Sequence, residues 1–294
     1  MKRPDAILCA DLHIWYGQPR CRTDVFKEAL IRKINWLKTK SGKIIHTPNG
    51  YEFNSDFVGE DIPIICAGDV FHKWNNDPAL LADMIETLPH MICIPGQHDV
   101  PGNTMSNYPL SSLRVLEAAD AVSVIRFTER KTQFSGSLTL CGREILLVHE
   151  LLWAKKPWTG LTKGNAVDFI NKNSEYDLIV SGDNHEPFVV QNEKTLLVNP
   201  GSFTRMTAAQ KDHKPRVYLW YAKTNTVEPL YIPIEEDVVS NKHLAEGDSL
   251  DGFVAEMKEV YDLEISFVGN MKQFLSKNRT RKEVRDIIWR ATDG

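Results

Sequence analysis

Five short polar clusters, each placed directly after a short apolar run, constrain the fold of this chain most strongly. The apolar runs have the length and composition of buried β-strands, so each cluster is predicted to sit at the C-terminal end of a strand. In open α/β sheets, binding sites gather at that edge. The runs span residues 6–10, 62–67, 91–94, 145–148 and 178–180. The clusters are Asp11-Leu12-His13, Gly68-Asp69-Val70-Phe71-His72, Gly96-Gln97-His98-Asp99, Val148-His149-Glu150 and Gly182-Asp183-Asn184-His185.

The side chains in these clusters are ligands for divalent metal ions. Carboxylate, imidazole and amide groups suit hard and borderline ions. One histidine after a strand is more often a core or capping residue, but a series of them at successive strand ends is poorly explained by chance. Five of the nine histidines of the chain fall in the clusters: His13, His72, His98, His149 and His185. The pattern therefore predicts two-metal phosphoester chemistry.

Length, composition and charge limit the class of protein. A chain of 294 residues is one large domain, or one domain with a small appendage. A hydrophobic content of 42% and a charged content of 25% are ordinary for a soluble globular enzyme. The formal net charge is −4, whereas free-standing binders of duplex DNA are more often basic. A nucleic-acid substrate would therefore have to be held by local patches, by the metals or with a partner.

The cysteines and the apolar segments predict a cytoplasmic location. The five cysteines include no C-x-x-C pair, and Cys9, Cys66 and Cys93 fall beside apolar runs, as small buried hydrophobic residues do. This usage indicates a reducing compartment rather than a disulfide framework. The first apolar run is short and ends at Asp11, so no signal peptide is expected. No stretch approaches the length of a membrane span, and no membrane contact is expected.

Strands and helices alternate early in the chain, and strand pairs dominate later. This order predicts two packed sheets with helices outside, a four-layer α/β/β/α sandwich. Helices are expected at 24–40, after an N-cap at Asp77, at 111–119 and at 164–173, and a hairpin at 43–53 around Asn49-Gly50. Later strand pairs are expected at 132–148, at 188–191 with 195–198, and at 216–221 with 227–232. Residues 1–234 are predicted to form the catalytic domain, and 235–294 a small helical C-terminal region.

The order Asp-x-His, Gly-Asp, Gly-x-His-Asp, a lone His and Gly-x-x-His resembles the signature of the calcineurin-like metallophosphoesterases. The resemblance runs from residue 7 to about residue 203 and implies the same four-layer fold. Two segments, Gly68-Asp69-Val70-Phe71-His72 and Asn199-Pro200-Gly201-Ser202, are similar to DNA double-strand-break repair nucleases of the SbcD type. The short chain is similar to bacteriophage or prophage members of that group.

The resemblance implies a ligand set for two divalent ions. Mn²⁺ is expected first, with Mg²⁺ or Fe²⁺ as alternatives. Two positions depart from the family pattern: Gln97 stands in place of Asn, and Asp183 in place of His. Both departures fall on the second ion, which is either retuned toward harder ions or weakly held; both readings stay open. The first ion would be held by Asp11, His13, Asp69 and His185, and the second by Asp69, Gln97, His149 and Asp183.

The resemblance also implies roles in the reaction. Two ions bridged by Asp69 would lower the pKa of a shared water, which then attacks the phosphorus. His98 would face the phosphate and the leaving oxygen, and Asp99 could orient its ring. The alternative for Asp99 is a residue that only forms the turn. His72 would steady the scissile phosphate or the metal ligands.

Two loops near the clusters are aromatic and basic, which suits single-stranded nucleic acid. The alternative is that their aromatic side chains cover the edge of the core. A basic stretch at 272–290 could also touch a phosphate backbone, although such stretches are more often a solvated helix face. The candidate substrate-binding residues are Trp15, Tyr16, Arg20, Trp153, Lys155 and Lys156, with Arg22 and Trp158 in the same loops.

Three hypotheses about function follow. The first is a Mn²⁺-dependent nuclease of the SbcD type acting on DNA, favoured by His72 and by 199–202. The second is a phosphodiesterase or phosphatase for a small ester, favoured by the acidic net charge. The third is a non-catalytic scaffold with a decayed second site, against which the retention of His98 and Asp99 argues. An ATPase partner subunit and a second copy of the chain are partners that the sequence leaves open.

Overall fold

The computed structural model describes residues 3–40, 62–125, 134–156 and 162–242. The chain divides into two compact units, and each is described by itself. The first comprises Met1–Gln18, Asp24–Arg205 and Asp212–Glu236, and the second Pro19–Thr23, Met206–Lys211 and Asp237–Gly294. The hairpin expected at 43–53 and nearly all of the helical region expected at 235–294, including the basic stretch, lie outside the described residues. The domain boundary at residue 234 therefore stays a prediction.

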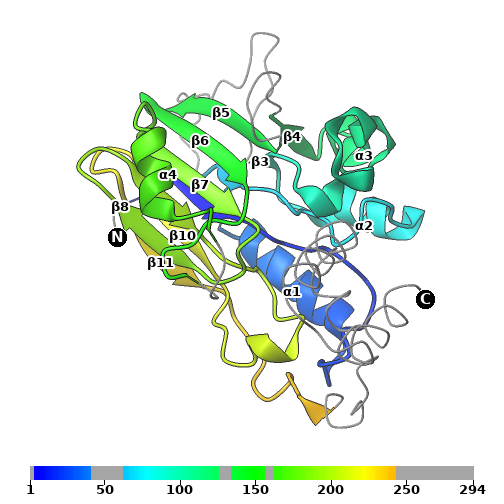
Figure 1. Cartoon of the computed structure of the whole chain (residues 1–294). Helices are drawn as coiled ribbons and strands as arrows, with labels where there is room; N and C mark the ends of the chain where they lie inside the picture. The colour runs from blue at the N-terminus through cyan, green and yellow to red at the C-terminus, as the bar shows by residue number, and fades with distance from the viewer. Residues whose placement is uncertain (1–2, 41–61, 126–133, 157–161, 243–294) are drawn as a thin grey trace, which may run out of the picture. The chain divides into compact units, whose positions relative to one another are not determined.

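The first sheet of the first unit has six strands in the order β11-β10-β1-β2-β3-β4 (Figure 1). Strands β1 to β4 run parallel, and β10 pairs antiparallel with β1. The C-terminal ends of β1, β2 and β3 consequently share one edge, where the first three polar clusters follow. The strands are β1 (Ala6–Cys9), β2 (Ile64–Cys66), β3 (Met91–Cys93), β4 (Val122–Val124), β10 (Arg216–Tyr221) and β11 (Thr226–Tyr231).

The second sheet has five strands in the order β5-β6-β7-β9-β8. Strand β7 runs parallel to both β6 and β9, while β5 and β8 are antiparallel partners at the two edges. The predicted turn between β5 and β6 is confirmed: Cys141 and Gly142 both have positive φ. The strands are β5 (Ser135–Leu140), β6 (Arg143–His149), β7 (Leu178–Gly182), β8 (Phe188–Gln191) and β9 (Leu196–Asn199).

In the described part of the chain, four α-helices accompany the sheets, at the positions that the sequence predicts. The carboxylate of Asp77 accepts a hydrogen bond of 2.9 Å from the Leu80 amide, and Pro78 is the first helical residue, so the predicted cap is confirmed. Among the described residues, no helix is long and apolar enough to cross a membrane. The helices are α1 (Phe26–Lys38), α2 (Pro78–Thr87), α3 (Ser112–Ala118) and α4 (Ala166–Lys172). Short 3₁₀ helices are η1 (Gln97–Asp99), η2 (Pro101–Asn103), η3 (Met105–Leu110) and η4 (Ala208–Gln210).

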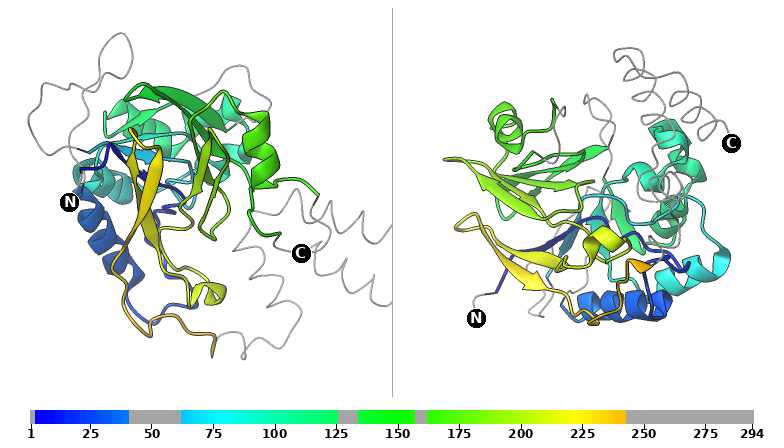
Figure 2. Two further views of the ribbon diagram at one scale, coloured as in Figure 1. Left: turned by 90° about the vertical axis from the view of Figure 1, so that its left-hand side faces the viewer. Right: turned by 60° about the horizontal axis from the view of Figure 1, so that its bottom comes forward.

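The two sheets pack face to face around one apolar core. Leu8 and Ile65 from the first sheet and Leu147 and Val180 from the second belong to the same buried cluster. A second cluster, which includes Ile170, joins α4 to the outer face of the second sheet. Helices α1, α2 and α3 lie on the side of the first sheet (Figure 2). The predicted four-layer α/β/β/α sandwich is therefore confirmed.

Buried thiols mark the layer directly behind the polar clusters. Cys9, Cys66 and Cys93 stand in register on β1, β2 and β3 and are at most 1% exposed. All three are free cysteines. They pack as small hydrophobic residues, as predicted.

The second unit contributes only short described segments. Arg22 and Val239 form an antiparallel bridge. The Ser240 amide donates to the Cys21 carbonyl at 2.7 Å, and the Thr23 amide to the Val238 carbonyl at 2.9 Å. Arg20, a candidate substrate-binding residue, belongs to this unit and is described apart from the clusters.

Candidate metal centre

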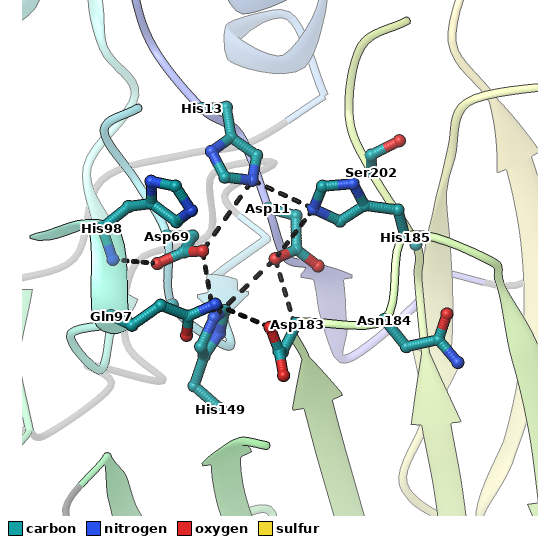
Figure 3. A network of polar contacts seen from close by, with 12 residues as sticks. Asp11, His13, Asp69, Gln97, His98, His149, Asp183, Asn184, His185 and Ser202 are labelled. Atoms are coloured by element: carbon teal, nitrogen blue, oxygen red, sulfur yellow. Dashed lines mark hydrogen bonds and ion pairs between the residues drawn. The ribbon is translucent and has the colours of Figure 1, made fainter. Parts of the chain in front are cut away.

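The polar clusters of both sheets converge on one centre (Figure 3). Those after β1, β2 and β3 reach it from the first sheet, and those at the ends of β6 and β7 reach it from the second. The residues that the structure brings together are Asp11, His13, Asp69, Gln97, His98, His149, Asp183 and His185.

Several of these residues have a left-handed backbone conformation, which directs their side chains toward the centre. The φ angles are 50° at Asp11, 45° at His13, 50° at Asp69 and 76° at Asp183. This conformation is unfavourable for L-residues, by about 1–2 kcal/mol each in the general case, and it tends to concentrate at functional sites. The loops hold it by continuing the strand pairing: the Asp11 amide donates to the Gly68 carbonyl at 3.1 Å, and the His13 amide to the Asp69 carbonyl at 3.0 Å.

One possible ion position lies among Asp11, His13 and His185. Their ligand atoms are all within 4.8 Å of one another. The Nε2 atoms of His13 and His185 face each other at 3.1 Å, and Asp69 Oδ2 is 3.8 Å from His13 Nε2. Burial lowers the pKa of His13 well below its ordinary value, and desolvation lowers the pKa of His185 to about 4. Both rings are therefore neutral at pH 7, and neutral imidazole is the form that ligates a metal.

A second position lies among Asp11, Asp69 and His149, whose ligand atoms also fall within 4.8 Å of one another. His149 Nδ1 donates to the Ala67 carbonyl at 2.6 Å, because a carbonyl oxygen can only accept. That bond turns Nε2 toward the carboxylates, 3.1 Å from Asp69 Oδ2 and 3.9 Å from Asp11 Oδ1. A backbone carbonyl behind a histidine is the usual way a metal ligand is oriented.

Charges within the centre shift the pKa of each group. Burial alone would lower the pKa of His149, but Asp69 and Asp11 more than offset it and raise that pKa well above its ordinary value. Burial alone would raise the pKa of Asp69, but His149 and His98 hold it well below the usual range. Burial, with Asp69 and Asp183 nearby, raises the pKa of Asp11 to about 7 despite His149. Without a metal ion, a protonated His149 therefore supplies positive charge beside the Asp69 and Asp11 carboxylates.

Glycines make room for the ligands. A Cβ atom at Gly68 or at Gly182 would lie 2.5 Å from Nδ1 of His149, and a Cβ at Gly96 would collide with the Asp69 carboxylate. These glycines precede Asp69, Asp183 and Gln97 and are visible in the sequence. The reason for these glycines cannot be read from the sequence, because the side chains that fill the space come from other segments of the chain: His149 from β6 and Asp69 from the loop after β2.

The buried atoms at the centre fit divalent cations. Asp11 Oδ2 is buried without a hydrogen-bond partner among the described residues. Asp69 Oδ2 and His149 Nε2 face each other as an ion pair and make no hydrogen bond that the described residues supply. Buried polar atoms without a hydrogen-bond partner are uncommon, and bound divalent ions would satisfy the carboxylate oxygens and, after loss of its proton, His149 Nε2. Asp11, His13 and His185 could hold one ion, with Asp69 3.8 Å from His13, and Asp11, Asp69 and His149 could hold a second. The hydrogen-bonded side chains of Gln97 and Asp183 lie beside this second group.

His98 reaches the centre without being needed by either ligand set. Its backbone amide donates to Asp69 Oδ1 at 2.9 Å, and its Nδ1 lies 2.9 Å from the His72 carbonyl. Nδ1 must therefore carry the hydrogen, because a carbonyl oxygen only accepts. The ring centroid of His98 is 4.9 Å from that of His13 and 5.5 Å from that of His72, nearly parallel to the latter at 16°.

The expected role of Asp99 in orienting the His98 ring is wrong. The carboxylate of Asp99 is buried and accepts hydrogen bonds from three backbone amides: those of Val70 at 3.1 Å, Phe71 at 2.8 Å and Gly96 at 2.9 Å. Asp99 holds the loop after β2 against the loop after β3, and the carbonyl of His72 orients the ring instead.

Of the candidate substrate-binding residues, Trp15 lies closest to the centre. Its ring centroid is 5.0 Å from that of His72, tilted by 38°, and Nζ of Lys73 is 5.5 Å from the Trp15 ring. A Cβ atom at Gly17 would collide with the indole, so the ring rests on that glycine. The sequence Trp15-Tyr16-Gly17 thus places a fixed aromatic surface one ring away from His98.

The remaining candidates are placed differently. The Tyr16 hydroxyl donates to Asp83 at 2.8 Å, and Nζ of Lys27 lies 3.9 Å from its ring centroid, so Tyr16 links α1 to α2 and its part in substrate binding stays a prediction. Trp153 Nε1 donates to the Lys163 carbonyl at 2.9 Å. Lys155 and Lys156 are exposed, and Trp158 lies outside the described residues.

Metal binding at pH 7 is expected to release protons. His149 and, in part, Asp11 hold protons there because their pKa values are raised, whereas His13 and His185 are already neutral. The apparent affinity should fall as the pH falls, by about tenfold per unit for each proton displaced. Isothermal titration of Mn²⁺ into metal-free protein, in two buffers with different ionisation enthalpies, measures the release. Heats that do not depend on the buffer would contradict it.

The family model described as the calcineurin-like phosphoesterase superfamily domain matches residues 53–221, more than half of the chain. No curated protein matches.

Solved structures with related folds share little sequence with this chain. A hypothetical protein from Pyrococcus horikoshii OT3 is 13% identical, with 87% of this chain and 97% of that chain covered and a TM-score of 0.42. A novel archaeal phosphodiesterase is 13% identical over 77% of this chain and 99% of its own, with a TM-score of 0.41. Vps29 from Chaetomium thermophilum is 14% identical over 79% and 97%, with a TM-score of 0.37. The assignment rests on the family model, and by it the chain belongs to the calcineurin-like phosphoesterase superfamily.

Proposed function

We propose that this chain is a two-metal phosphodiesterase whose natural substrate is DNA. The observation that carries the phosphodiesterase proposal is the position of Asp69. Its Oδ2 lies 3.1 Å from His149 and 3.8 Å from His13, so one carboxylate faces both ligand sets. Bound divalent ions supply Lewis acidity and activate water at such a site. The protein holds the two ligand sets together through Asp69 and places His98 Nε2 beside them.

The His98 side chain supplies the proton transfer in this proposal. The His72 carbonyl accepts the Nδ1–H of His98 at 2.9 Å, and in this proposal the doubly protonated ring donates its Nε2 hydrogen to the leaving oxygen. A phosphodiester leaving group is a poor one unless it is protonated as the bond breaks. The His72 ring lies parallel to His98 and separates it from Trp15.

Two observations support DNA rather than a small ester. Trp15, with Lys73 near its ring, gives the edge of the centre the aromatic and cationic character that binds single-stranded nucleic acid. The segment Asn199-Pro200-Gly201-Ser202 resembles the SbcD-type nucleases in sequence, and it contacts the centre because the Ser202 amide donates to the His185 carbonyl at 3.1 Å. We therefore keep the SbcD-type, Mn²⁺-dependent nuclease as the specific proposal, with a cytoplasmic location and with an ATPase subunit or a second copy as partner.

A phosphodiesterase or phosphatase for a small ester is the second candidate. The formal net charge of −4 favours it, because nothing in the overall charge attracts a polyanion. A scaffold with a decayed site is disfavoured, since the buried Asp11 Oδ2 and the Asp69–His149 pair remain arranged for a cation.

Assays with Mn²⁺ on single- and double-stranded DNA, beside bis-p-nitrophenyl phosphate, separate these candidates. We expect hydrolysis of all three, abolished by a chelator. Trp15→Ala should reduce cleavage of single-stranded DNA by about tenfold or more, because stacking of one base contributes about 1–3 kcal/mol, and should change hydrolysis of bis-p-nitrophenyl phosphate, which carries no base, much less. Trp74→Ala, which removes a 39% exposed tryptophan from the neighbouring loop, is the matched control.

Each contrary result identifies another candidate. Hydrolysis of the small ester without any cleavage of DNA would replace the nuclease by the small-ester enzyme. Bound metal without hydrolysis of any phosphoester would leave only the scaffold.

A further inference from the structure

The two positions that depart from the family pattern contact each other. Nε2 of Gln97 donates to Oδ1 of Asp183 at 2.6 Å, a charge-assisted hydrogen bond. Gln97 begins η1 after β3 of the first sheet, and Asp183 follows β7 of the second. The contact therefore spans the two sheets at the mouth of the centre, where both side chains are partly exposed (Figure 3).

The backbone of Asp183 is fixed in place for this contact. Its φ is 76°, and its amide donates to Oδ1 of Asp11 at 3.1 Å. The carboxylate cannot easily turn away, because the residue is held on its backbone side by a group of the first ligand set. The terminal amide of Gln97 can rotate by a half turn with little change in shape.

Side-chain length explains why the two departures occur together. Glutamine is one methylene longer than asparagine, and aspartate reaches less far than histidine. The side chain that comes from the first sheet, Gln97, is longer than the family's asparagine, and the side chain that comes from the second sheet, Asp183, is shorter than the family's histidine. An asparagine at 97 would fall short of Asp183 by about one C–C bond, about 1.5 Å.

We propose that Gln97 and Asp183 form a matched pair that sets the metal preference of the second ion position. Without an ion, the amide nitrogen of Gln97 satisfies the Asp183 carboxylate and keeps both arms in place. With an ion, the amide turns and offers its oxygen, so the pair presents two oxygen donors where the family pattern has one oxygen and one nitrogen. Oxygen donors favour Mn²⁺ and Mg²⁺ over Zn²⁺. This inference rests on the proposed two-metal function, but it concerns binding and not turnover.

A double-mutant cycle measured by metal binding tests the pairing. Isothermal titration and metal analysis would compare the natural protein with Gln97→Asn, Asp183→His and the double variant. Each single variant should lose at least about tenfold in affinity for the second Mn²⁺, a loss of the size that displaced metal-site groups produce. The double variant should recover most of the affinity and shift its preference toward Zn²⁺. Glu186→Gln, an exposed change in the same loop, is the control and should bind both ions normally.

A cycle in which the two losses simply multiply would overturn the pairing. Gln97→Glu provides a second test that conserves shape, removes the donor N–H and adds a negative charge facing the Asp183 carboxylate. It should lower the melting temperature of the metal-free protein and enlarge the shift that Mn²⁺ produces; unchanged melting in both states would also overturn the proposal. None of these readouts uses a substrate, so a failure of the proposed nuclease activity leaves the cycle interpretable.

Discussion

Replacing Asp69 by asparagine is expected to remove both metal ions together and to lower phosphodiester hydrolysis by at least about 10³-fold. The carboxylate faces His149 at 3.1 Å and His13 at 3.8 Å, so both ligand sets depend on one negative charge. An amide has no charge to share and presents N–H donors where a lone pair is required. Metal analysis after gel filtration, combined with initial rates on bis-p-nitrophenyl phosphate in Mn²⁺, measures both losses.

The fold should survive this change. Oδ1 of Asp69 accepts from the His98 amide at 2.9 Å, and the oxygen of an asparagine can do the same. Asp177→Asn makes the same chemical change at a carboxylate that binds Arg143 at 3.0 Å, and it should retain both ions and activity. If Asp69→Asn kept one ion at full occupancy, the two ligand sets would not share this residue.

Local sequence was sufficient for the strands and helix ends. Buried parallel strands are continuous apolar runs, so 91–94 and 178–180 could be recognised as strands, and each delivers its polar cluster to the same edge of its sheet. The cap at Asp77 is a local signal as well, because the carboxylate and the amide it accepts from are three residues apart. Such features depend on neighbours in the sequence and need no knowledge of the fold.

Roles that depend on distant partners could not be predicted. Asp99 follows His98 directly, which suggested a contact between the two, yet its carboxylate binds amides of the loop after β2. Tyr16 belongs to an aromatic and basic loop, which suggested substrate binding. Its hydroxyl donates to Asp83 of α2, and Lys27 of α1 lies over its ring. In each case the side chain binds a group that is far away in the sequence, and the packing of the fold brings the two together.

The departures at Gln97 and Asp183 show the same limit from another side. Read separately, each weakens the ligand pattern of the second position. Their hydrogen bond of 2.6 Å shows that the two changes meet, since the clusters after β3 and β7 are brought together only by the packing of the two sheets. Both departures can be seen in the sequence, but the hydrogen bond between Gln97 and Asp183 can be seen only in the fold.

His98→Ala is expected to retain both metal ions and to lose about 10²–10⁴-fold in turnover on phosphodiesters, the usual contribution of a general acid. The contact of His98 with Asp69 is made by its backbone amide, which alanine keeps, so the ligand set should be undisturbed. The loss should shrink for esters whose leaving group needs no proton. Rates on esters with a series of leaving-group pKa values, with bound metal measured in parallel, test this.

His72→Ala distinguishes the contribution of the His98 ring from that of the His72 ring stacked on it. The carbonyl of residue 72, which fixes Nδ1 of His98 at 2.9 Å, belongs to the backbone and remains, whereas the stacked ring at 5.5 Å is lost. This variant should therefore keep the leaving-group dependence of the natural protein and lose less activity than His98→Ala. His13, His72 and His98 also have ligand atoms within 4.8 Å of one another. Loss of an ion in His98→Ala, or an equal loss of rate on activated and unactivated esters, would make His98 a ligand rather than the acid.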